Sequence, residues 1–270
     1  MKIIKSIVSL LTICTVLIAD PEIIKFSVID DFPDPLGGGL WWTNSDGSLL
    51  GGAYYFGSSF LWTEEGGLEH TGGASVRAMD NNGLLVGESP FPMIMGDTLT
   101  DVEAACYYDG EEWVMMGPIQ GTQPFDPYMY QGAWAVAADT FIVAGMYWHS
   151  NYSTTAFVWS PEDPDGELLP DNGPDLSSRP NDMSADGSVI VGWASIEIDG
   201  QYTDRSAHAW IRNELTGEYD LVFLGYLGNQ GGWVGGEAYG VSPNGQLICG
   251  SSPGAMFVWT EETGMQDIGF

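Results

Sequence analysis

Five side chains occupy one equivalent place in five similar stretches of the sequence, three residues before a recurring turn. They are Trp41, Arg77, Trp134, Asn181 and Tyr239. Aromatic rings stack on planar ligand faces, and Arg and Asn hydrogen-bond polar substituents, so the set suits a sugar or a polar small molecule. The alternative is that these side chains only pack the wall of a channel.

Two carboxylates close to the same places, Asp80 and Asp182, are the candidates for acid–base chemistry. Glycoside hydrolysis requires two carboxyl groups at a fixed separation, one of them with a raised pKa. The chain contains 37 acidic residues, which permits such a pair without identifying it. A hydrolase is therefore the alternative hypothesis, and a binding module without catalytic residues is the first.

One acidic segment, residues 162–167, raises the question of a metal. Asp163, Asp165 and Glu167 stand at alternate positions around Gly166, as in acidic calcium loops, but the full loop and its distal Glu are missing. A solvated acidic turn is the alternative to calcium. No other cofactor is expected, because the three histidines are scattered and no Cys/His spacing fits zinc.

The strands and turns that must position these residues recur along the sequence. The first repeated segment occurs as NSDGSLLGG (44–52), DNNGLLVG (80–87), AADTFIVAG (137–145), SADGSVIVG (184–192) and SPNGQLICG (242–250). Four copies carry Asp-Gly or Asn-Gly, which favours a two-residue hairpin turn, while the third carries Asp139-Thr140.

A second repeated segment follows the first in each copy. It is an apolar run that contains one aromatic residue at an equivalent position. The aromatic residues are Trp62, Tyr108, Trp159, Trp210 and Trp259. The run is apolar on both faces, which indicates sheets stacked face to face, so these residues are expected to act as wedges between neighbouring sheets. A short segment precedes each turn, and a less well repeated segment ends each unit. Together with the two repeated segments, these give four strands per unit.

Units of about 50 residues with four short strands have the size of a propeller blade. The sequence therefore predicts an all-β propeller of five four-stranded blades in a single domain, residues 20–270. The repeats span roughly 37–73, 74–118, 132–174, 179–227 and 236–270. Residues 24–32 resemble one further fourth strand, so six blades are the alternative, and a five-bladed propeller glycoside hydrolase is the form that the hydrolase hypothesis takes.

The start and the charge of the chain bear on its location. Residues 1–19 read as an export signal peptide, with Lys2 and Lys5 before an apolar stretch; an uncleaved anchor is the alternative. A net charge of −30 disfavours nucleic acid and anionic membranes as partners. We therefore expect a secreted protein, extracellular or periplasmic, without an integral membrane segment in the mature chain.

Cys106 and Cys249 belong to different repeats and are expected to be free buried thiols, with a single bridge as the alternative.

The combined segments resemble the extracellular HAF-type repeat family over most of residues 37–270. Residues 182–227 match well, and the last copy matches at Ser242, Asn244, Gly245, Leu247, Ile248, Gly250, Phe257, Val258, Trp259, Gly264, Met265, Asp267, Ile268 and Gly269. The resemblance implies a secreted or surface bacterial protein with propeller-like repeats and no established enzymatic activity. Its partner is then expected to be a glycan, a small molecule or a protein surface.

Overall fold

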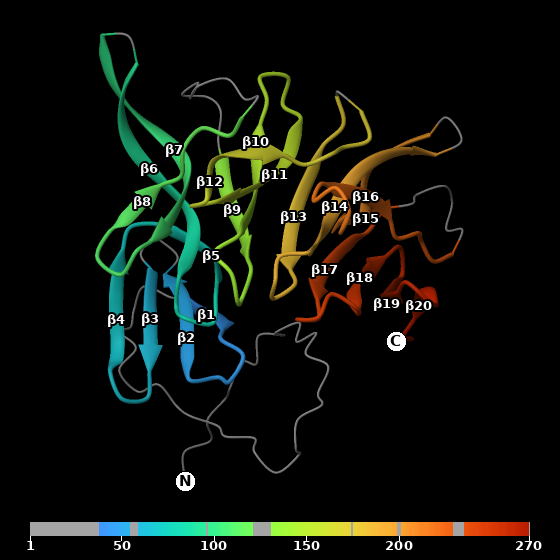
Figure 1. The fold of residues 1–270 in the computed structure, drawn as a ribbon, viewed down its shortest axis with the longest axis horizontal. Helices are drawn as coiled ribbons and strands as arrows, with labels where there is room; N and C mark the ends of the chain where they lie inside the picture. Colours follow the sequence, from blue (N-terminus) through green and yellow to red (C-terminus); the bar gives the residue numbers. More distant parts are fainter. Residues whose placement is uncertain are drawn as a thin grey trace.

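The computed structural model describes residues 38–54, 59–95, 97–120, 131–173, 175–198, 201–228 and 235–269. Their 20 strands form five four-stranded antiparallel sheets, each built from consecutive strands and arranged as the blades of a propeller (Figure 1). This confirms the predicted all-β propeller with five four-stranded blades. The signal segment 1–19 and the surplus segment 24–32 lie outside the described residues.

The strands follow one another along the chain. Blade 1 consists of β1 (Gly38–Thr43), β2 (Leu49–Tyr54), β3 (Ser59–Thr63) and β4 (Gly67–Gly72). Blade 2 consists of β5 (Ser75–Met79), β6 (Leu85–Met95), β7 (Thr98–Tyr108) and β8 (Trp113–Met115). Blade 3 consists of β9 (Gln131–Val136), β10 (Val143–Trp148), β11 (Thr154–Ser160) and β12 (Asp163–Leu168). Blade 4 consists of β13 (Ser178–Met183), β14 (Val189–Ile198), β15 (Gln201–Arg212) and β16 (Tyr219–Phe223). Blade 5 consists of β17 (Glu237–Val241), β18 (Ile248–Ser252), β19 (Ala255–Thr260) and β20 (Gly264–Asp267).

The repeated turn joins the first and second strands of a blade, but it is not the two-residue hairpin that the Asp-Gly pairs predict. In blade 4, Ser184 N donates to Val189 O at 2.8 Å, so four residues form the loop. Gly187 has a φ of 75°, whereas Asp186 before it has no positive φ. The wider loop forms because the Ser184 hydroxyl accepts the Val189 N–H at 2.9 Å and the Asp186 carboxylate accepts the Ser188 N–H.

These turns are joined to one another from blade to blade. The N–H of Asp139 donates to Ala185 O at 2.8 Å, and the N–H of Ala185 donates to Pro243 O at 2.9 Å. In blade 1 the N–H of Ser45 donates to the side-chain oxygen of Asn81, also at 2.8 Å. We call this side of the propeller, which carries the turn after each first strand, the turn end.

The glycine that closes the repeated segment faces the first strand of its own blade. A Cβ atom at Gly192 would lie 2.0 Å from the carbonyl oxygen of Arg179, and one at Gly250 would lie 2.1 Å from that of Glu237. In each of these blades the first strand bulges beside the glycine. The close approach of the two backbones therefore excludes any side chain at the end of the segment.

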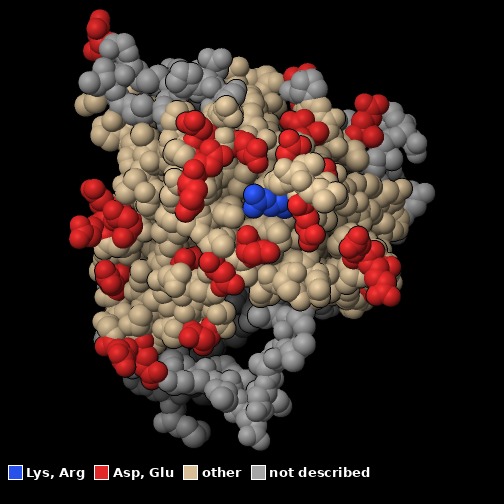
Figure 2. All heavy atoms as spheres, in the orientation of Figure 1, with Lys and Arg blue, Asp and Glu red and all other residues tan. Residues whose placement is uncertain are grey.

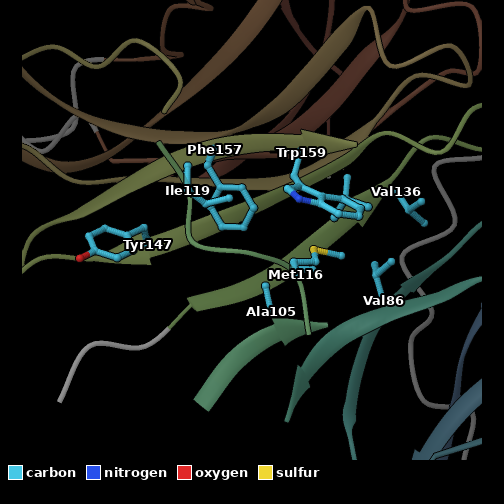
Figure 3. Close-up of a cluster of buried hydrophobic side chains, with 10 residues drawn as sticks. Val86, Ala105, Met116, Ile119, Val136, Tyr147, Phe157 and Trp159 are labelled. Carbon is cyan, nitrogen blue, oxygen red and sulfur yellow. The ribbon is translucent and has the colours of Figure 1, made fainter. Parts of the chain in front are cut away.

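Three of the repeated tryptophans, Trp159, Trp210 and Trp259, pack at the interfaces between blades. Trp159 lies in a cluster with Val86 and Met116 of the preceding blade, and Figure 3 shows its ring above these side chains. Trp210, which is fully buried, packs against blade 3, and its indole N–H donates to Pro170 O at 2.8 Å. Trp259 packs at the edge of the cluster between blades 4 and 5. Trp62 is half-buried in β3.

Tyr108 occupies the position of the repeated tryptophan in blade 2. It packs with Trp42 and Leu61 of blade 1, and its ring centroid lies 5.6 Å from that of Trp113. The indole N–H of Trp113 donates to Thr71 O in blade 1 at 2.7 Å. A second aromatic ring from the last strand thus donates to the preceding blade in blade 2, as Trp210 itself does in blade 4.

The two cysteines differ from each other. Cys106 is buried and free, as expected. Cys249 is disulfide-bonded, so the expectation of a free thiol is wrong for this residue. Placement in different repeats argues only against a bridge between Cys106 and Cys249, and the structure contains no such bridge.

Candidate ligand-binding site

The five residues predicted to line a binding site share one backbone position. Each is the extra residue of a β-bulge in the first strand of its blade, where the pairing with the second strand shifts by one residue. They are Trp41 in β1, Arg77 in β5, Trp134 in β9, Asn181 in β13 and Tyr239 in β17. A bulge turns its side chain away from the regular alternation of the strand. The repeat therefore places one side chain per blade outside the regular alternation of its first strand.

The environments of these five side chains are not equivalent. Trp41 and Tyr239 are 56% and 44% exposed, whereas Arg77, Trp134 and Asn181 are half-buried. The exposed pair belongs to blades 1 and 5, and the half-buried three belong to blades 2, 3 and 4. Only the first group offers an open aromatic face to a ligand.

Blades 2 to 4 carry an alternating series of guanidinium groups and indole rings. The Cζ atoms of Arg77 and Arg179 each lie 4.5 Å from the Trp134 ring centroid. Arg179 and Arg205 lie 5.7 and 4.9 Å from the Trp193 ring centroid. These distances are typical of cation–π contacts. We call the series Arg77, Trp134, Arg179, Trp193 and Arg205 the arginine–tryptophan ladder.

Two buried carboxylates pair with the ladder. Glu88 accepts hydrogen bonds from Arg77, with 3.1 Å between Nε and Oε1. Glu237 accepts from Arg179 at 3.2 Å and, through its other oxygen, from Arg205 at 2.7 Å. Glu237 therefore ties the first strand of blade 5 to two arginines of blade 4.

Asn181 is part of this network. Its oxygen accepts from Nη2 of Arg179 at 2.9 Å, and its amide nitrogen donates to Ala238 O at 2.9 Å and to Glu237 at 3.3 Å. Both protons of the amide are thus committed to protein acceptors. The Asn181 side chain thus holds Arg179 and Glu237 in place.

The ladder gathers the positive charge of the described chain. Of the four arginines among the described residues, Arg77, Arg179 and Arg205 belong to the ladder and Arg212 does not. Figure 2 shows one small basic area near the middle of the face in view, with acidic side chains around it. A chain with a net charge of −30 therefore presents one local cationic site on this face.

A pocket of about 500 Å³ opens beside the last arginine of the ladder. Its lining includes Arg205, Glu237, Tyr239, Ser251, Ser252 and Pro253. The Arg205 side chain is 53% exposed, and the Tyr239 hydroxyl accepts a hydrogen bond from Ser251 at 3.0 Å. A guanidinium group and an aromatic face thus meet in one concave site. We call this site the Arg205 pocket, and its side of the propeller the ladder end.

Three buried polar atoms near the ladder have no hydrogen-bond partner among the described residues. They are Nε1 of Trp134, Nε1 of Trp193 and Oε1 of Gln131. Buried polar atoms in proteins are nearly always bonded, to protein, water or ligand. The ladder end therefore retains unused hydrogen-bonding capacity.

The two carboxylates considered for hydrolysis support the backbone. Asp80 accepts the N–H groups of Asn82 and Leu84 at 2.8 and 2.7 Å, which is the turn-closing role that Ser184 has in blade 4. Asp182 accepts the Val241 N–H at 2.9 Å and so joins blades 4 and 5. Burial raises the pKa of Asp182 to about 6. The two carboxylates lie in blades 2 and 4, which are not neighbours along the chain of blades.

The acidic segment considered for calcium forms a strand. Asp163, Asp165 and Glu167 lie on β12, the last strand of blade 3, and all three are exposed. The described part of the chain holds no group of three or more His, Cys, Asp or Glu side chains that could bind a metal ion.

No helix within the described residues is long and apolar enough to cross a bilayer.

Sequence reasoning found two residues of the ladder, Arg77 and Trp134. It missed Arg179, Trp193 and Arg205 and their carboxylate partner Glu237. None of the four missed residues stands at the repeated bulge position. A usable signal was the scarcity of basic residues, since only four arginines follow residue 37 and three of them meet here.

Comparison with known proteins adds to the fold. No family model matches the chain, and no curated protein matches it. Among solved structures, a putative TolB from Agrobacterium tumefaciens matches with a TM-score of 0.51 and 11% sequence identity, over 83% of this chain and 78% of that one. At this identity the likeness shows a common propeller fold and nothing about the ligand.

Proposed function

We propose that the chain is an exported ligand-binding propeller that takes a glycan or another polar small molecule in the Arg205 pocket. The observation that carries the proposal is the meeting of a half-exposed guanidinium, Arg205, with the exposed ring of Tyr239 in a pocket of about 500 Å³. Ligand sites of this size combine an aromatic or apolar wall with a few fixed polar groups.

Export and the absence of catalysis belong to the same proposal. Residues 1–19 have the basic start and apolar stretch of a signal peptide. The HAF-type resemblance of residues 37–270 points to a secreted or surface bacterial protein of the same kind. In an exported propeller of this composition, a binding role fits the residues of the ladder end better than a reaction does.

The hydrolase hypothesis has one observation in its favour, the raised pKa of Asp182. Against it, the Asp182 carboxylate is occupied by the Val241 N–H, and Asp80 is occupied by two backbone N–H groups of its own turn. A hydrolase would show turnover of chromogenic glycosides that disappears in Asp182→Asn. We expect no such turnover in the wild type.

A glycan and small-molecule array on the chain from residue 20 onward tests the proposal. We expect at least one glycan to bind, and Tyr239→Ala to abolish the signal because it removes the aromatic wall of the pocket. Tyr152→Ala, at an exposed tyrosine of blade 3, is the matched control and should bind as the wild type does. Undiminished binding by Tyr239→Ala would refute the pocket as the site.

The same array tests Trp41, the other exposed aromatic residue of the bulge positions. If the site extends across the centre of the propeller, Trp41→Ala weakens binding of longer glycans and leaves binding of monosaccharides unchanged. If Trp41→Ala binds longer glycans and monosaccharides as tightly as the wild type does, the site is confined to blades 4 and 5.

A further inference from the structure

We propose that the Arg205 pocket recognises two hydroxyl groups on neighbouring carbons of a sugar ring, and that Arg205 and Glu237 bind them together. This inference rests on the proposed function, since it names the ligand group that the same pocket takes. It is argued from the hydrogen-bonding positions of the two side chains and from the aromatic ring that shares their pocket.

Glu237 offers the pocket a hydrogen-bond acceptor. The two oxygens of a carboxylate carry about four lone-pair sites. Oε2 accepts from Arg179 at 3.2 Å and from Asn181 at 3.3 Å, whereas Oε1 accepts from Arg205 at 2.7 Å. Among the described residues these are the donors to Glu237, so a lone-pair site remains on Oε1. Glu237 lines the pocket, and Oε1 is the oxygen that is bonded to the pocket arginine.

Arg205 offers donors at the same place. Its guanidinium has five N–H groups, and within the described residues its hydrogen bond is the one from Nη1 to Glu237. The Arg205 Cζ lies 4.9 Å from the Trp193 ring centroid, and this contact holds the group in place together with the bond to Glu237. The side chain is 53% exposed and lines the pocket. The pocket therefore presents a donor directly beside an acceptor.

A pair of adjacent hydroxyl groups matches this donor and acceptor. A hydroxyl both donates and accepts, whereas a carboxylate only accepts and an ammonium only donates. One hydroxyl can donate to Oε1 of Glu237 while its neighbour accepts from Arg205, because Nη1 and Oε1 lie only 2.7 Å apart. A ligand carboxylate would leave the Glu237 site unused, and a ligand ammonium would leave the Arg205 donors unused. Two neighbouring hydroxyls use both side chains.

The rest of the pocket fits the sugar ring that carries such hydroxyls. Tyr239 is 44% exposed, and Ser251 fixes its ring by donating to its hydroxyl at 3.0 Å. A pyranose has an apolar C–H face beside its hydroxyl edge, so the face can stack on Tyr239 while the edge meets the Arg205–Glu237 pair. Glycines also line the pocket and add no side chain that would fill it: Gly235, Gly236 and Gly254.

The probes are the methyl pyranosides of glucose, galactose and mannose, each with its 2-, 3- and 4-deoxy forms, titrated by calorimetry into the chain used for the array. We expect at least one parent sugar to bind. Removal of either hydroxyl of one adjacent pair should weaken binding about 10- to 100-fold, as for a hydrogen bond to a charged group, and removal of the third hydroxyl less than about 3-fold. Equal losses at all three positions, or no binding by any parent sugar, would overturn the proposal.

A mutant cycle assigns one of the two hydroxyls to Arg205. Arg205→Gln should bind the parent sugar as weakly as the wild type binds one of the two deoxy forms, and that deoxy form should lose no further affinity. Arg212→Gln is the matched control, since Arg212 lies outside the pocket and donates to Gly217 O, and it should keep both losses.

A second variant covers the case in which Arg205→Gln is unfolded in a thermal melt. Arg205→Lys keeps the charge but offers its donors from one nitrogen, so it should show a smaller loss than the wild type for the same deoxy form. A folded Arg205 variant in which both deoxy forms still lose as much affinity as in the wild type would refute the assignment.

The failure of this inference and that of the proposed function are distinguishable. If the array finds a ligand that Tyr239→Ala abolishes and that has no adjacent hydroxyl groups, such as a primary amide, the pocket is a ligand site and the inference about hydroxyls is wrong. If the array finds no ligand that depends on Tyr239, the proposed function itself is wrong.

Discussion

The two ends of the propeller differ in how their polar groups are satisfied. At the turn end, repeated residues close each turn, and neighbouring turns bond to one another through backbone groups such as Asp139 N with Ala185 O. At the ladder end, the bonds run between side chains that occur once, such as Arg205 with Glu237. Buried indole N–H groups without described partners are found near the ladder.

This difference separates stability from binding. A backbone bond between turns recurs at several blade junctions, as in Asn81 N with Ala138 O and Ala185 N with Pro243 O, and carries no information about a ligand. A side chain that occurs once is free to specify a ligand, provided that the repeated bulge holds it in place. Substitutions at the turn end and between blades should therefore reduce stability, while those in the Arg205 pocket should reduce binding.

The largest expected effect compares two tryptophans. Trp210→Ala should lower the free energy of unfolding by about 3 to 5 kcal/mol, because a fully buried ring between blades 3 and 4 is removed. Trp41→Ala, at a ring that is 56% exposed, should leave it within about 0.5 kcal/mol of the wild type. Urea unfolding measures both. Similar losses of unfolding free energy in the two variants would contradict the distinction between a ring packed between blades and an exposed ring open to a ligand.

The next prediction tests whether the repeated glycine supports the ladder. Gly192→Ala would place a Cβ 2.0 Å from the Arg179 carbonyl oxygen, which requires the bulge to move, so we expect a loss of about 3 kcal/mol together with weaker ligand binding. In Gly217→Ala the new Cβ meets no atom within 4 Å, so only the φ of 79° is unfavourable, and we expect a loss of about 1 kcal/mol in unfolding free energy. A Gly192→Ala protein with wild-type stability would show that the bulge is not fixed by this contact.

Much of the fold was predictable from the repeat, and the reason is physical. Each copy of the segment has to bury both faces of its sheet, so four strands per copy and the aromatic wedges follow from the pattern of apolar residues. The bulge positions, including Arg77 and Tyr239, were found because they are equivalent in the repeat. The four-residue turn was missed because the side-chain acceptor of Ser184 favours a wider loop than the Asp-Gly pair does alone.

The ladder was not predictable in the same way. Arg179, Trp193 and Arg205 lie on three strands of blade 4, and Glu237 comes from blade 5. Their proximity depends on strand register and on the packing of two blades, and no repeated copy indicates it. The disulfide of Cys249 was missed for a related reason, since the spacing within the repeats gives no sign of it.

A prediction of intermediate size concerns pH. The pKa of Asp182 rises from an ordinary 3.8 to about 6 in the folded chain, so the folded state binds this proton more tightly than the unfolded state does. The wild type therefore loses stability as the pH rises from about 4 through 6. Asn does not titrate, and its oxygen can still accept the Val241 N–H.

The advantage of Asp182→Asn over the wild type should accordingly grow by about 1 to 1.5 kcal/mol between pH 5 and pH 8. Urea unfolding at several pH values measures the difference, with Asp220→Asn, at an exposed carboxylate of blade 4, as the reference substitution. A pH-independent difference for Asp182→Asn would show that this carboxyl group titrates normally.

The smallest effect compares two serines from the two ends. The Ser184 hydroxyl is fully buried and accepts the Val189 N–H, so Ser184→Ala leaves a backbone donor unpaired and should cost about 1 kcal/mol in unfolding free energy. The Ser251 hydroxyl donates to Tyr239 at an exposed site, where water can replace it, so Ser251→Ala should change stability by less than about 0.5 kcal/mol. In a ligand titration the order reverses: Ser251→Ala weakens binding in the Arg205 pocket and Ser184→Ala does not. If both serines instead affect stability alone, the Ser251 hydroxyl does not contribute to ligand binding in the Arg205 pocket.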